Sequence, residues 1–177
     1  MAKKKYVRDY EFSDTLDSKG RVKSVPVYVG AYFRFCDAAA AKKSGRILAP
    51  AAVVGWLAYL AALWLPSGAG KLMYVILPFV FSVVPLWYVS TAVFALLRAG
   101  DKLKRSEVEK VSGNLPSASV FGIILTAAAL LAEGITAIAA PEKLNSSDIA
   151  FAVGAVILCA VFALAFSRRQ AVATDVF

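Results

Sequence analysis

The stretch that decides the fold is Ile149–Phe166, IAFAVGAVILCAVFALAF, in which every residue is apolar or small and none is charged. A helix rises about 1.5 Å per residue, so a segment of about 20 residues crosses the roughly 30 Å hydrocarbon core of a bilayer. Three further stretches share this character: Ile47–Leu65, Leu72–Leu97 and Ser117–Ala140. The sequence therefore predicts an all-α integral membrane protein, built as a bundle of four transmembrane helices.

The composition agrees with this fold class. Hydrophobic residues make up 59% of the 177 residues and charged residues only 18%, and the mean hydropathy is +0.66. A soluble domain carries a larger share of charged side chains. We divide the chain into an N-terminal extension, residues 1–46, and a membrane bundle, residues 47–177.

The basic residues are distributed unevenly along the chain. Of the 20 lysines and arginines, 18 lie before the first span, between the second and third spans, or after the fourth. The other two loops hold one cation each, Lys71 and Lys143. By the positive-inside rule both termini are predicted to be cytoplasmic, and this basic face attracts anionic lipid headgroups. No nucleic-acid-binding motif accompanies the net charge of +8, so the bilayer is the expected partner and nucleic acid is not.

The N-terminal extension has the pattern of a β-hairpin followed by a short helix. Tyr6–Phe12 partly alternates, Val22–Val29 is rich in β-branched residues, and turn-forming residues occupy positions 17–21 between them. Pro26 lacks an N–H donor, which favours an edge strand. Asp37–Gly45 has an acid at its start, lysines near its end and a terminal glycine, so we predict a separate interfacial helix there.

Aromatic residues crowd the end of the predicted hairpin, just before this helix. They are Tyr28, Tyr32, Phe33 and Phe35. Aromatic side chains gather at the headgroup level of membranes, and an isolated hairpin is only marginally stable in water. We therefore expect this segment to contact the membrane surface or a partner protein.

Two further patterns concern the shape of the spans. Pro78 and Pro85 predict a kinked or tilted second span. The capping-box spacing of Ser106–Glu109 predicts a brief cytoplasmic helix that residues 112–114 end, and Pro116 suits the first turn of the third span.

Small residues at four-residue spacing recur in three of the spans. In membranes this spacing allows the close approach of two helices. The pairs are Ala51 and Gly55, Ala118 and Gly122, and Ala150 and Gly154. The sequence leaves open whether these faces pack within one chain or within a homo-oligomer.

One charged side chain, Glu133, lies well inside a predicted span, toward its outer end. An ionised acid in hydrocarbon is costly, so Glu133 must face the bundle, a partner or water, or carry a proton. Thr136, one turn further on, and Thr126, two turns earlier, extend this candidate proton or substrate site. Alternatively, Glu133 pairs with Lys71 or Lys143 and only fixes packing, and the threonines bond to their own backbone.

The sequence contains no pattern typical of an enzyme. It has no histidine, which removes the usual general base and the commonest metal ligand. It also has no glycine-rich phosphate loop and no paired acids within the spans. The two cysteines, Cys36 and Cys159, are too few for a disulfide framework. We expect no catalytic residue, metal or cofactor.

Two hypotheses of function remain. In the first, the protein is a non-enzymatic subunit or adaptor of a membrane complex, and its cytoplasmic N-terminal extension engages the partner. In the second, it is a small proton- or ion-coupled transporter that uses Glu133.

Overall fold

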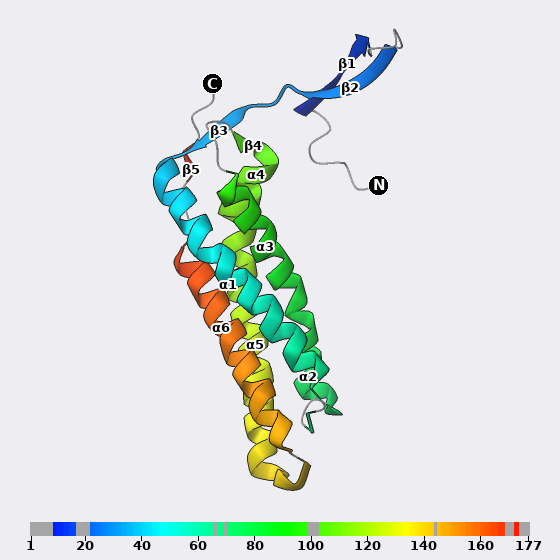
Figure 1. Ribbon diagram of the computed structural model, residues 1–177, viewed down its shortest axis with the longest axis vertical. Helices are drawn as coiled ribbons and strands as arrows, with labels where there is room; N and C mark the ends of the chain where they lie inside the picture. The colour runs from blue at the N-terminus through cyan, green and yellow to red at the C-terminus, as the bar shows by residue number, and fades with distance from the viewer. Residues whose placement is uncertain are drawn as a thin grey trace.

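A computed structural model describes residues 9–16, 22–65, 67–68, 71–98, 103–143, 145–168 and 172–173. Four helical segments in it are long and apolar enough to cross a membrane, and they run side by side (Figure 1). They are α1 (Ala38–Trp64), α2 (Met73–Phe81) with α3 (Val83–Leu97), α4 (Arg105–Glu109) through α5 (Leu115–Ala139), and α6 (Ser146–Ser167). The predicted four-helix bundle is confirmed at this level.

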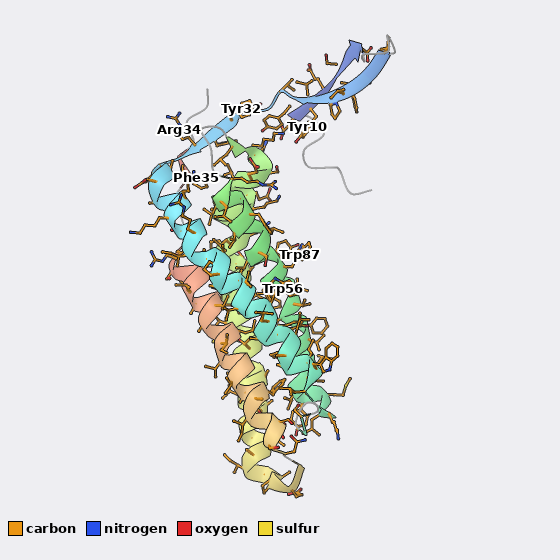
Figure 2. The ribbon with its side chains drawn as sticks, in the orientation of Figure 1. Tyr10, Tyr32, Arg34, Phe35, Trp56 and Trp87 are labelled. Atoms are coloured by element: carbon orange, nitrogen blue, oxygen red, sulfur yellow. The ribbon has the colours of Figure 1, made fainter. Side chains whose placement is uncertain are left out.

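The bundle buries a core of large apolar side chains and presents others outward. Within it, α5 packs against α2, α3 and α6, and α1 packs against α3 and α6. Phe79, Phe151 and Phe162 are fully buried, whereas Leu57, Trp87 and other large apolar residues are exposed on the outside. Figure 2 shows Trp56 of α1 and Trp87 of α3 about halfway along the bundle. An outer surface this apolar is suited to lipid and not to water.

The prediction of a separate helix that ends at Gly45 is wrong, because α1 continues through this residue to Trp64. Asp37 does cap the helix, since its carboxylate accepts a hydrogen bond from the Ala40 N–H at 2.9 Å. Gly45 serves a packing role instead. A Cβ at this position would lie 3.0 Å from the Cβ of Leu96, so the glycine lets α1 and α3 approach closely.

The second span is interrupted by a turn at Ser82, as its prolines predicted. Pro85 has no N–H to donate to the carbonyl of Phe81, so the helical ladder is broken there. Nearby carbonyls find other donors. The Ser82 hydroxyl donates to the Phe79 carbonyl at 2.6 Å, and the Tyr59 hydroxyl of α1 donates to the Val80 carbonyl at 3.1 Å.

The prediction that a short helix ends at residues 112–114 is also wrong. A π-helical turn, η3 (Lys110–Asn114), joins α4 to α5 and makes one helix of 35 residues. Within it the Leu115 N–H donates to the Lys110 carbonyl, one residue further back than in an α-helix. The helix also starts earlier than predicted, because the Glu107 carboxylate caps the Lys104 N–H at 3.0 Å.

Two small sheets lie at one end of the bundle (Figure 1). The predicted hairpin is present as β1 (Tyr10–Leu16) and β2 (Val22–Tyr28), paired antiparallel with Tyr10 opposite Tyr28. Its predicted turn and the start of its predicted first strand lie outside the described residues. The second sheet, with order β4–β3–β5, was not predicted. It joins β3 (Tyr32–Phe35) to β4 (Leu103–Lys104) and β5 (Val172–Ala173), and so ties together three segments distant in sequence.

Candidate functional site

Glu133 lies in α5 near the end of the bundle opposite the sheets, and its side chain is only 7% exposed. Its buried Oε2 atom has no hydrogen-bond partner among the described residues. Most buried carboxylates in proteins accept hydrogen bonds or pair with a cation. Among the described residues Asp9, beside β1, also has a buried oxygen without a partner, but Glu133 is the one of the two that lies within a helix of the bundle.

Thr136 lies one helical turn after Glu133 and links α5 to α2. Its hydroxyl donates to the Ala132 carbonyl at 2.9 Å, and it lies 3.0 Å from the hydroxyl of Tyr74 in α2. The side chain of Thr136 is buried. This contact brings two hydroxyl groups, from two helices, to the helix face that carries Glu133.

Asp148, in the first turn of α6, supplies a second buried carboxylate at the same end. Its Oδ2 atom accepts hydrogen bonds from the backbone N–H groups of Asn145 and of Gly68, the latter at 3.3 Å. Asp148 and Glu133 are both buried at this end of the bundle. Four elements thus converge here: α5, α6, α2 and the segment after α1.

Thr126 makes only local hydrogen bonds in the described structure. Its buried hydroxyl donates to the carbonyls of Gly122 and Ile123, at 2.8 and 3.2 Å. This is the backbone bonding that threonines in membrane helices commonly make. Thr126 and Glu133 are both buried residues of α5, and the extension of the site to Thr126 stays a prediction.

The proposed pairing of Glu133 with a lysine has no support from Lys71. This residue is exposed, and no ion pair joins it to Glu133 in the described structure. The side chain of Lys143 lies outside the described residues. A groove of about 270 Å³ between α3 and α5 does not include Glu133, and it is mostly apolar, with Pro85, Tyr88 and Phe121 among its lining residues.

A second cluster holds the base of the hairpin against the bundle (Figure 2). The rings of Tyr10, Tyr28 and Tyr32 form successive edge-to-face pairs with centroids 5.2 and 5.1 Å apart. Lys104 Nζ lies 5.5 Å from the centroid of the Tyr28 ring, and the Arg105 N–H donates to the Tyr28 hydroxyl at 3.2 Å. Aromatic pairs and cation–π contacts of this kind are each worth about 1 kcal/mol. They fix where the hairpin leaves the bundle.

The aromatic residues that were predicted to form an interface largely contact other parts of the same chain. Phe35 is 3% exposed and belongs to the core, while Phe33 is half-buried against it. Tyr28 and Tyr32 are half-buried in the cluster described above. The exposed apolar surface of the extension lies instead on the hairpin, where Phe12 is 77% exposed and Val22 is 69% exposed.

The predicted small residues lie at contacts between helices of one chain in three cases. A Cβ on Gly122 would meet the Phe162 ring of α6, one on Gly154 would meet Ala62 of α1, and one on Gly55 would meet Leu86 of α3. Their partners in the predicted pairs differ in burial: Ala118 is buried, Ala51 half-buried and Ala150 exposed.

Tyr74 and Lys104 contribute to these two clusters and were not singled out from the sequence. Neither belongs to a recognisable motif, because each acts through contacts made across the fold. No protein-family model, curated protein or solved structure matches this chain.

Proposed function

We propose that this protein is a non-enzymatic subunit or adaptor of a membrane complex. In this proposal it crosses the bilayer four times with both termini in the cytoplasm. Its bundle acts as an anchor, and its N-terminal hairpin engages a partner protein. The observation that carries the proposal is the hairpin itself, which stands away from the bundle and exposes apolar side chains (Figure 1).

The orientation is supported by where the basic segments meet. Of the 20 basic residues, 18 belong to the N-terminal extension, to the connection between the second and third spans, or to the segment after α6. The sheet β4–β3–β5 gathers these three segments at one end of the bundle. By the positive-inside rule this end is cytoplasmic, next to the anionic headgroups of the inner leaflet.

The partner role is supported by the incomplete packing of β1 and β2. These strands pair with each other and make few contacts with the helices. A two-stranded hairpin is marginally stable alone, and an exposed strand edge is a template for a further strand. A partner that adds a strand or covers Phe12 would complete the small sheet.

The strand register supports β1, in preference to β2, as the edge that binds a partner strand. The Val29 N–H donates to the Asp9 carbonyl at 2.9 Å, so residues 9 and 29 form a hydrogen-bonded pair. In an antiparallel ladder every second pair is hydrogen-bonded in this way. Phe12 and Asp14 belong to the pairs between, and their backbone N–H and C=O groups therefore point away from β2. On β2, Pro26 occupies the matching outward position and has no N–H to offer. The edge of β2 is therefore interrupted at Pro26, whereas β1 has no proline, which favours β1 as the edge that binds a further strand.

The test is co-purification from native membranes with two substitutions at one position. Asp14→Pro removes an outward backbone N–H from β1 together with the side-chain contact to Ser24, whereas Asp14→Ala removes only the side-chain contact. We expect the partner to be lost with Asp14→Pro and kept with Asp14→Ala. A chain that lacks residues 1–29 should lose it as well, while β3 remains intact.

The result against the proposal is equally clear. If the full chain, the Asp14→Pro variant and the chain without residues 1–29 all purify alone, or all with the same proteins, then the hairpin recruits no partner.

A second candidate is a small proton- or ion-coupled transporter, and the buried, unpartnered Oε2 atom of Glu133 favours it. A carboxylate within a membrane bundle can bind and release a proton or cation as the protein changes conformation. If this is the function, Glu133→Gln abolishes pH-dependent uptake in proteoliposomes while the protein still inserts. A Glu133→Gln variant with normal uptake would exclude it.

A further inference from the structure

The polar cluster at the end of the bundle opposite the sheets has an unbalanced charge. Asp148 is compensated, because its carboxylate accepts two backbone N–H donors at the N-terminal end of α6, where the helix dipole favours a negative charge. Glu133 is not compensated in this way, and its Oε2 atom is buried without a partner. The part of the cluster that the structure describes therefore lacks one positive charge.

The polar side chains named at this end of the bundle offer oxygen atoms. Thr136 and Tyr74 bring hydroxyls 3.0 Å apart one turn after Glu133, and the neighbouring helix α6 brings the buried Asp148 carboxylate to the same end. The chain has no histidine, Cys36 precedes α1, and Cys159 lies in the middle of α6. Oxygen donors without sulfur or imidazole select hard cations over transition metals.

The charge of the cation follows from the same groups. The described residues hold no cluster of three or more acidic, cysteine or histidine side chains of the kind that binds a divalent metal. With Asp148 already stabilised by backbone donors, one cation of charge +1 neutralises Glu133. In a low-dielectric site, a neutral assembly is strongly favoured over a charged one.

We propose that Glu133, Asp148, Thr136 and Tyr74 form a binding site for one monovalent cation between α5, α6 and α2. A proton and an alkali-metal ion share this chemistry, and the experiment below separates them. The site does not require that the protein transports the ion, since a bound cation can equally hold the helix ends together. It goes beyond the adaptor role, and its test measures binding and stability instead of partner capture or uptake.

The test uses the purified full-length protein in detergent and measures its melting temperature. Sodium, potassium and choline chloride are compared at equal ionic strength and fixed pH, and choline chloride is then compared across neutral and acidic pH. A bound cation stabilises only the folded state, so we expect the melting temperature to rise by on the order of 5 °C with the ion that occupies the site. A rise with sodium or potassium identifies a metal ion, and a rise only with acid identifies a proton.

Three variants assign this effect to the site. Glu133→Gln removes the charge with little change in shape and should abolish the dependence on the ion. Tyr74→Phe removes one hydroxyl and should reduce it. Glu142→Gln changes an exposed acid at the same end of the bundle and should leave it unchanged. The other titratable and charged side chains described at this end of the bundle are Asp148 of α6, Tyr74 of α2, and the exposed Lys71 and Glu142.

The proposal is overturned if the melting temperature of the natural sequence is the same in all salts and at all pH values. It is also overturned if Glu133→Gln and Tyr74→Phe respond as the natural sequence does, because the ion then acts elsewhere.

Discussion

At the scale of single residues, two glycines of α5 have opposite surroundings. A Cβ on Gly122 would lie 2.6 Å from the ring of Phe162, which is fully buried and has little room to move, whereas a Cβ on Gly134 would meet nothing within 4 Å. We predict that Gly122→Ala lowers the free energy of unfolding by about 1–3 kcal/mol, as overpacking does in other cores.

Unfolding by sodium dodecyl sulfate in mixed micelles measures this difference. Gly134→Ala is the matched control in the same helix, and we expect it to leave stability unchanged or slightly raised, since alanine is the better helix former. If the two substitutions have the same effect, then α5 and α6 are not as close at Gly122 as the structure places them.

At the scale of elements, the sequence predicted which segments become helices better than where the helices end. The long apolar stretches identified all four helices that are long and apolar enough to cross a membrane, because a bilayer imposes both length and composition. Gly45 and Gly113 were predicted to end helices, since glycine commonly does so in isolation. Tertiary packing overrides that preference at Gly45, which lies against α3, whereas the exposed Gly113 lies within the π-helical turn that continues into α5.

The prolines of the second span were more informative, because a missing N–H cannot be restored by packing. The break at Ser82 follows directly from the absent donor of Pro85. The sequence did not show how the membrane tolerates this break. In the structure Tyr59, from a different helix, donates to the carbonyl of Val80, and unsatisfied carbonyls in a membrane are costly.

The surroundings of Glu133 could be predicted only in part. The short connection between α5 and α6 makes an antiparallel helix pair, so residues equally far from the turn lie opposite each other. Glu133 lies six residues before the end of α5 and Asp148 two residues after the start of α6, so this rule does not place the two opposite each other. The sequence does place Thr136 one turn after Glu133, but the contact of Thr136 with Tyr74 could not be predicted, since it depends on how the broken second span packs against α5.

At the scale of the whole molecule, the two ends of the bundle differ in chemistry. One end carries the sheet β4–β3–β5, the hairpin and the segments richest in lysine and arginine. The other carries the Glu133 cluster and two short connections. An asymmetry of this kind favours the orientation that we propose, because moving many cations across the bilayer is costly while the other end presents no such barrier.

This orientation can be tested with the native cysteine at the basic end. Cys36 is exposed and precedes α1, whereas Cys159 lies in the middle of α6. We predict that a membrane-impermeant maleimide labels Cys36 only after the membrane is opened. In a Cys36→Ser background, Ser146→Cys at the exposed start of α6 should be labelled in intact cells.

Three spans separate positions 36 and 146, so the two cysteines must lie on opposite sides of the bilayer. Labelling of both positions from the same side would contradict the four-span topology itself. If position 36 is labelled in intact cells and position 146 only after the membrane is opened, then the four spans are kept and both termini lie outside.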